Sequence, residues 1–66
     1  MEFRQLKTFV TAARLESFSK TAELLGYSQS AVTVQIRLLE EELDTRLFDR
    51  LGRKIALTAQ GQRFLE

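Results

Sequence analysis

The apolar residues in the first part of the chain recur three and four positions apart, which is the spacing of one face of an α-helix. A first helix is therefore predicted from about Glu2 to Leu15, with the carboxylate of Glu2 placed favourably for the helix dipole. Its apolar face is expected to lie in the core as scaffold. The residues on this face are Phe3, Leu6, Phe9, Val10 and Ala13.

Capping signals follow the first helix, and together they predict a helix-turn-helix. Ser17 or Ser19 can cap a short second helix that runs to Leu25, because a hydroxyl accepts hydrogen bonds from the free amides of a first turn. Gly26 suits the left-handed position that ends a helix, and Ser28 is placed to cap the next one. A two-turn helix, a tight turn and a second capped helix make up this motif.

The third predicted helix, Ser28 to Leu43, has an apolar stripe and an opposite polar face. The stripe consists of Val32, Ile36, Leu39 and Leu43. The opposite face holds small or hydrogen-bonding groups and a single cation, namely Ser30, Val34 and Arg37, flanked by Gln29 and Thr33. Three carboxylates gather at the C-terminal end, where the helix dipole disfavours them: Glu40, Glu41 and Glu42. The pattern suits a helix whose first half enters a nucleic-acid groove, and it also suits a bundle helix with a chance acidic end.

After Leu43 the helical spacing ends, and two short stretches have strand character. They are residues 47–50 and 54–57, joined by a turn at 51–53 that contains Gly52. A hairpin after a helix-turn-helix is a wing, and this one places three cations on or near its tip: Arg50, Arg53 and Lys54. Solvated cations on an ordinary hairpin are the alternative. Three cations in one short hairpin, next in sequence to the helix with the polar face, favour contact with nucleic acid.

A last helix is predicted from Thr58, whose hydroxyl can cap it. It breaks off at Glu66, and Phe64 and Leu65 are expected to have no packing partner within the chain. Exposed apolar residues at such a point suggest a truncated helix that would continue onto a partner or a further domain. The predicted organisation is a winged helix-turn-helix domain at residues 1–57 and the start of a linker helix at 58–66.

Composition excludes several classes of function. A chain of 66 residues forms one small domain, and it contains neither Cys nor His. Disulfides and zinc sites are therefore not expected. Without His the usual general base is absent, and no Cys or His nucleophile pair exists, so we expect no enzyme activity, no metal and no cofactor. Neither a signal peptide nor a membrane span is expected, and a cytoplasmic location is the default.

The net charge of +1 does not by itself indicate a nucleic-acid partner, but the charges are unevenly distributed. Residues 40–44 hold four carboxylates and no cation, whereas residues 46–63 hold five cations and one carboxylate. A basic segment therefore follows immediately after an acidic one.

Five sequence stretches, in this order, resemble the N-terminal DNA-binding domain of LysR-type bacterial transcriptional regulators. They are FRQLKTFVTAA, SFSKTAELLGYSQSAVT, the Leu39-Glu40 pair followed by Glu42-Leu43, the segment 47–50, and LTAQGQRFL. The resemblance covers essentially the whole chain and implies a mainly α winged helix-turn-helix of three helices and a two-stranded wing. It also implies a linker helix through which two domains dimerise, and an absent C-terminal domain that senses a small-molecule effector.

Transferred by position, the resemblance assigns five residues to a recognition helix in the major groove: Ser28, Gln29, Ser30, Thr33 and Arg37. Arg53 would be the wing contact to the backbone or minor groove, supported by Arg50 and Lys54. The family often has Pro where Ser30 stands and commonly Arg where Val34 stands. Val34 is therefore either an ordinary exposed aliphatic residue or an apolar surface for a thymine methyl group.

The residue types suit these roles. Gln29 can form a bidentate pair with adenine, and Arg37 can reach guanine or phosphate. Helix N-termini favour phosphate, so the opening amides of the second and third helices, with Ser19, Ser28 and Lys20 nearby, are candidate backbone contacts. The expected partner is double-stranded DNA that carries an AT-rich interrupted palindrome. The competing class is a protein-docking or oligomerisation module, which would need an apolar or aromatic anchor on the same face.

Overall fold

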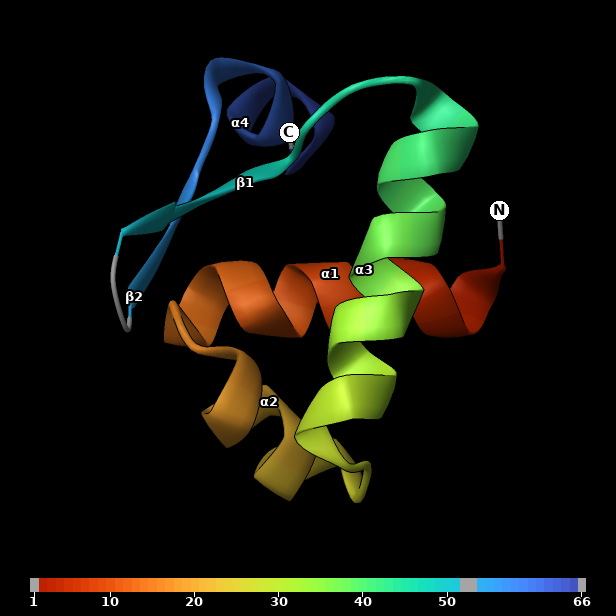
Figure 1. Cartoon of the computed structure of the whole chain (residues 1–66), viewed down its shortest axis with the longest axis vertical. Helices are drawn as coiled ribbons and strands as arrows, with labels where there is room; N and C mark the ends of the chain where they lie inside the picture. The colour runs from red at the N-terminus through yellow and green to blue at the C-terminus, as the bar shows by residue number, and fades with distance from the viewer. Residues whose placement is uncertain (1, 52–53, 66) are drawn as a thin grey trace.

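The computed structural model describes residues 2–51 and 54–65. The elements follow the order α1 (Phe3–Leu15), α2 (Phe18–Leu25), α3 (Gln29–Leu43), β1 (Phe48–Leu51), β2 (Lys54–Leu57) and α4 (Ala59–Leu65). In Figure 1, α3 crosses α1, α2 lies at one end of α3, and the β1–β2 hairpin projects to one side beneath α4. This arrangement confirms the predicted winged helix-turn-helix. None of the helices in the described ranges is long and apolar enough to cross a membrane.

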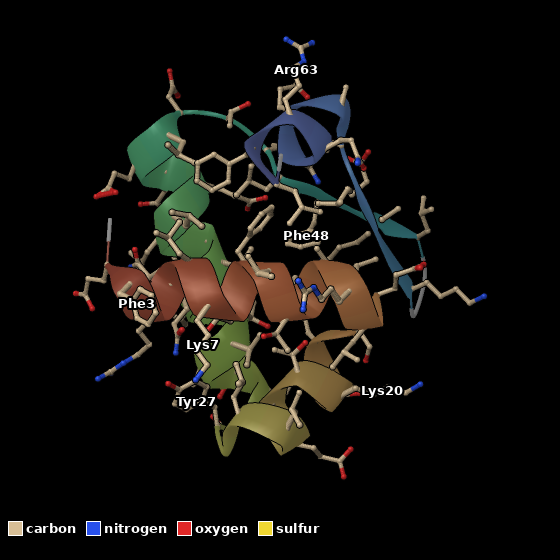
Figure 2. The ribbon with its side chains drawn as sticks, turned by 180° about the vertical axis from the view of Figure 1, so that it is seen from behind. Phe3, Lys7, Lys20, Tyr27, Phe48 and Arg63 are labelled. Carbon is tan, nitrogen blue, oxygen red and sulfur yellow. The ribbon has the colours of Figure 1, made fainter. Side chains whose placement is uncertain are left out.

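α1 begins one residue later than predicted, and its buried face is shifted, although Phe9 is buried and Val10 and Ala13 pack against the core as predicted. Glu2 is the N-cap, and its backbone N–H donates to Gln5 Oε1 at 3.2 Å. The buried face runs through Thr8, Phe9 and Ala12, whereas Phe3 is 81% exposed. Figure 2 shows Phe3 at the outer end of α1, and in Figure 1 this end extends past the crossing with α3. The prediction that Phe3 lies in the core was therefore wrong.

Thr8 can be buried between α1 and α3 because its hydroxyl has a hydrogen-bond partner. Thr8 Oγ1 donates to Gln35 Oε1 of α3 at 2.6 Å. A buried hydroxyl without a hydrogen bond would cost about 1–3 kcal/mol, and this bond removes that cost. A polar residue thus takes an inward position at the crossing of α1 and α3.

The capping residues of the helix-turn-helix are those that the sequence indicated. Of the two serines proposed for the α2 cap, Ser17 fills it, and its hydroxyl accepts from the backbone N–H of Lys20 at 3.1 Å. Gly26 ends α2 with φ 77°, in the left-handed region that L-residues with a Cβ rarely adopt. Ser28 then caps α3 by accepting from the N–H of Ala31 at 3.1 Å.

Four phenylalanines join the helices, the hairpin and α4 into one core. The ring of Phe9 lies 5.5 Å from that of Phe48 and 5.3 Å from that of Phe64, and Phe18 packs edge-to-face on Phe48 at 5.4 Å. Phe48 accordingly lies between α1 and α4 in Figure 2. Phe64 and Leu65 both pack against the core, so the expectation that they lack a partner within the chain was wrong. α4 folds back onto α1 and β2 and supplies the missing contacts.

The hairpin is antiparallel, with Phe48 opposite Leu57 and Leu51 opposite Lys54. β1 therefore begins and ends one residue later than predicted. Gly52 and Arg53, which the sequence placed in the turn, lie outside the described residues. At the other end of the hairpin, Thr58 caps α4 as predicted and accepts from the N–H of Gly61 at 3.0 Å.

Candidate nucleic-acid interface

Two adjoining hollows lie between the helix-turn-helix and the hairpin. The first, of about 290 Å³, is lined by Ser17, Phe18, Ser19, Gln29, Arg50, Lys54 and Ile55. The second, of about 140 Å³, is lined by Phe18, Thr33, Ile36, Arg37, Glu40, Arg46, Phe48 and Arg50. Phe18 and Arg50 line both hollows, so the two adjoin at these side chains. We call them together the α3–wing groove.

α3 contributes three of its predicted recognition residues to this groove. Gln29, Thr33 and Arg37 are four residues apart, so they lie on one side of the helix. Gln29 lines the first hollow, and Thr33 and Arg37 line the second. The structure therefore brings these three side chains to the same groove as the cations of the hairpin.

The remaining predicted residues of the helix-turn-helix lie outside the groove lining. Ser28, Ser30 and Val34 are exposed on α3, and the Ser28 and Ser30 hydroxyl oxygens are 3.2 Å apart. Val34 is 42% exposed. Lys20 is exposed on α2, and Figure 2 shows it pointing away from the body of the protein. These side chains flank the groove and remain accessible to a partner larger than the groove itself.

Cations outnumber carboxylates along the groove. Its lining includes Arg37, Arg46, Arg50 and Lys54 but only one carboxylate, Glu40. A cleft lined by one sign of charge attracts ligands of the opposite sign. Among residues 2–51 and 54–65, no cluster of three or more acidic residues is arranged to hold a metal ion. The groove is thus suited to an anionic partner.

Two of these arginines form ion pairs at the surface. Arg37 Nη1 lies 3.1 Å from Glu41 Oε2, and both side chains are about 60% exposed. Arg46 Nη2 lies 3.6 Å from Asp49 Oδ1. Exposed pairs of this kind contribute roughly 0–1 kcal/mol, so an incoming phosphate can replace the carboxylate at little cost. Both arginines therefore remain available to an anion.

Glu40 has a structural role that the charge pattern did not reveal. Its Oε2 accepts hydrogen bonds from the backbone N–H groups of Leu47 at 2.7 Å and Phe48 at 3.2 Å. These bonds tie α3 to the start of β1. Glu40 thus lines the groove, and it fixes the hairpin relative to the polar face of α3.

The N-terminus of α2 opens onto the first hollow beside Arg50 and Lys54. The hydroxyl oxygens of Ser17 and Ser19 are 3.3 Å apart there. Partial positive charge at a helix N-terminus favours an anion such as phosphate. Arg46 and Phe18 belong to the groove as well, although sequence reasoning did not select them. The only sequence signal for Arg46 was its place in the basic segment.

Comparison with known proteins gives a consistent match. The family model described as bacterial regulatory helix-turn-helix protein, lysR family, matches residues 3–62. The HTH-type transcriptional regulator CitR of Bacillus subtilis (strain 168) is 54% identical over 65 residues, which are 98% of this chain and 22% of that protein. BudR of Klebsiella aerogenes is 47% identical over 66 residues, which are 100% of this chain and 46% of that regulator.

Solved structures match over nearly the whole chain. A crystal structure of the CbnR DNA-binding domain in complex with DNA has a TM-score of 0.95 and 43% identity, covering 98% of this chain and 75% of that one. The BenM DNA-binding domain in complex with benA site 1 DNA has a TM-score of 0.93 and 38% identity, covering 98% and 73%. The chain spans about 22% of the length of CitR, and thus corresponds to one part of that regulator.

Proposed function

The chain belongs to the lysR family of bacterial regulatory helix-turn-helix proteins, and from that premise we propose that it binds double-stranded DNA sequence-specifically for a transcriptional regulator. The observation that carries this function is the α3–wing groove. Recognition-type side chains of α3 and cations of the hairpin line the same two adjoining hollows. The likeness to domains solved in complex with DNA supports the same conclusion.

The exposed face of α3 is the proposed base-reading element. A major groove about 12 Å wide admits one α-helix, and the residues of its first turns reach the base edges. Gln29 in the first turn would pair with adenine, and Arg37 two turns later would contact guanine or phosphate. Ser28, Ser30, Thr33 and Val34 would complete the contact surface, with Val34 offering an apolar patch to a thymine methyl group.

Phosphate contacts would adjoin this helix along the groove. Ser19 and Lys20 lie at the start of α2, where amides and positive charge favour phosphate. Arg50 and Lys54, which line the same hollow as the start of α2, would follow the DNA backbone or the minor groove together with Arg53. Such contacts set affinity and position but carry no sequence information directly. Specificity would therefore depend on the few residues of α3.

The rest of the regulator is part of the proposal. Residues 1–57 would form the DNA-binding domain, and residues 58–66 would begin a linker helix through which two copies dimerise. A dimer suits an interrupted palindrome, because the symmetry of the site mirrors that of the protein. We expect the operator to be AT-rich and a small-molecule effector to bind a separate domain. A regulator of bacterial transcription acts in the cytoplasm.

A protein-docking or oligomerisation module is the competing function. It would require a large apolar or aromatic anchor on the exposed face of α3, since such residues dominate protein interfaces. The exposed large apolar side chains of α3 are Val34 and Leu38, which are 42% and 44% exposed, and neither is aromatic. The polar, cationic lining of the groove favours DNA.

Replacing Gln29 with alanine should relax selectivity at one base position. A bidentate side-chain contact to a base discriminates by about 1–3 kcal/mol, and its loss should weaken binding to the preferred duplex by that amount. Binding to random duplex DNA should change little. The measurement is a titration of both duplexes, after the preferred sequence has been selected from a randomised pool.

Gln62, which is exposed on α4, provides the matched control. Gln62→Ala removes the same amide group from a surface outside the groove, so both affinities should match those of the unaltered protein. Equal loss of affinity on preferred and random DNA in Gln29→Ala would rule out base reading by Gln29.

A further inference from the structure

Arg50 contacts an aromatic ring at the place where the two hollows of the groove meet. Its Cζ lies 5.7 Å from the centroid of the Phe18 ring. Arg37 and Arg46 instead contact the carboxylates of Glu41 and Asp49. The three described arginines of the groove are thus held in two different ways, two by carboxylates and one by an aromatic ring.

The ring beneath Arg50 is itself fixed by the core. Phe18 is 8% exposed and packs edge-to-face on Phe48, with ring centroids 5.4 Å apart and an interplanar angle of 87°. Phe48 in turn contacts Phe9. Phe18 belongs to α2 and Arg50 to β1, so their contact joins the helix-turn-helix to the hairpin across the floor of the groove.

A carboxylate neutralises the positive charge of an arginine, whereas an aromatic partner does not. The ring attracts the guanidinium through its quadrupole and carries no net charge, so the positive charge of Arg50 is not neutralised. The N–H donors lie in the plane of the guanidinium and remain able to bind phosphate in bidentate fashion. No ion pair has to break first, and less side-chain freedom is lost on binding.

We propose that Phe18 is a positioning residue for DNA binding: its ring holds the guanidinium of Arg50 over the junction of the two hollows, aimed at a backbone phosphate. This role rests on the proposed DNA binding and extends it to a residue of the core. Its expected contribution is modest, because a cation–π contact at a partly exposed site accounts for about a two- to fivefold change in an equilibrium constant.

The experiment is a double-mutant cycle on duplex DNA, with Phe18→Leu, Arg50→Ala and the double variant titrated at several salt concentrations. Phe18→Leu should weaken binding about two- to fivefold with an unchanged salt slope, because Arg50 still reaches the phosphate. Arg50→Ala should lower the slope by about 0.9, the value for one lost phosphate contact. In the Arg50→Ala background, Phe18→Leu should have no further effect.

Phe9→Leu is the matched control, since Phe9 belongs to the same aromatic cluster but does not contact Arg50. It should lower thermal stability while leaving the affinity of the folded protein unchanged. Phe18→Tyr, which keeps the ring, should bind within about twofold of the unaltered protein. Equal losses in Phe18→Leu and Phe9→Leu, or additive effects in the cycle, would overturn the positioning role.

A spectroscopic measurement covers the case in which Phe18→Leu does not fold. In the unaltered protein without DNA, the ring current of Phe18 should shift the δ-methylene protons of Arg50 upfield in the NMR spectrum. Random-coil shifts for these protons would overturn the contact. Failure of the unaltered protein to bind any duplex would overturn the proposed function, whereas binding with an additive cycle would overturn only the role of Phe18.

Discussion

Replacing Glu40 with alanine is expected to lower the free energy of unfolding by about 2–3 kcal/mol. The substitution removes the acceptor for two backbone N–H groups, those of Leu47 and Phe48. Leu47 is fully buried and Phe48 is nearly so, but Glu40 lines the groove, so water can replace only part of what the carboxylate supplies. For a 66-residue chain the total stability is roughly 3–10 kcal/mol, so this loss is a large fraction of it.

Chemical denaturation monitored by circular dichroism measures this loss. Glu41→Ala is the control, because Glu41 makes only an exposed ion pair with Arg37 and should change stability by less than about 1 kcal/mol. Glu40→Gln retains one oxygen acceptor and should fall between the two. Equal stabilities for Glu40→Ala and Glu41→Ala would show that the hydrogen bonds donated to Glu40 contribute nothing to the fold.

Gly61→Ala should destabilise the protein even though alanine is the better helix former. Glycine in a helix costs about 0.5–1 kcal/mol relative to alanine, so propensity alone predicts a gain. A Cβ at this position would collide with the backbone carbonyl oxygen of Leu47 and approach Leu57 Cδ2 to 2.9 Å. Backbone cannot rotate away as a side chain can, and overpacking of this kind costs about 1–3 kcal/mol or more. The net loss should be about 1–2 kcal/mol.

Comparing the thermal unfolding of Gly61→Ala with that of Gln60→Ala tests whether the steric cost of the Cβ exceeds the gain in helix propensity. Gln60 is exposed in the same helix, so the substitution to alanine there should be neutral within about 0.5 kcal/mol. An increase in the melting temperature of Gly61→Ala would mean that α4 does not pack against Leu47 as closely as the structure has it. The same contact region includes Phe64, which links α4 to the core.

Local signals in the sequence were sufficient to locate the turn of the helix-turn-helix, although they left Ser17 and Ser19 as alternative caps of α2. Ser17, Gly26 and Ser28 act within one turn of their own position, so the chemistry of capping is readable without a tertiary structure. The buried stripe of α3 was also readable, because Val32, Ile36 and Leu39 repeat at helical spacing and face the core. The helix-turn-helix was therefore predictable from residues alone.

Two features could not be predicted from local signals: which face of α1 is buried, and what α4 packs against. Which face of α1 is buried depends on where α3 crosses it, and the bond between Thr8 and Gln35 joins residues 27 positions apart. Phe64 was assigned no partner because α4 returns to Phe9 through the hairpin, a path that sequence spacing does not show. Long-range packing decided both cases.

The candidate site shows the same division. Gln29, Thr33 and Arg37 were recognisable as one helix face, but their alignment with Arg50 and Lys54 depends on how the hairpin is held against α3. Glu40 fixes the hairpin against α3 by accepting hydrogen bonds from two backbone N–H groups. The pattern of side chains in the sequence does not indicate hydrogen bonds to the backbone. The residue types indicated the chemistry of the groove, but only the structure shows how α3 and the hairpin are placed to form it.

The most direct test of DNA binding is a fluorescence-anisotropy titration at two salt concentrations. One labelled duplex is a random-sequence pool, and the other is an AT-rich interrupted palindrome. We expect binding to both that weakens as salt rises, because neutralised phosphates release counterions, with tighter binding to the palindrome. No binding to either duplex at low salt, by protein shown to be folded, would contradict the proposed function.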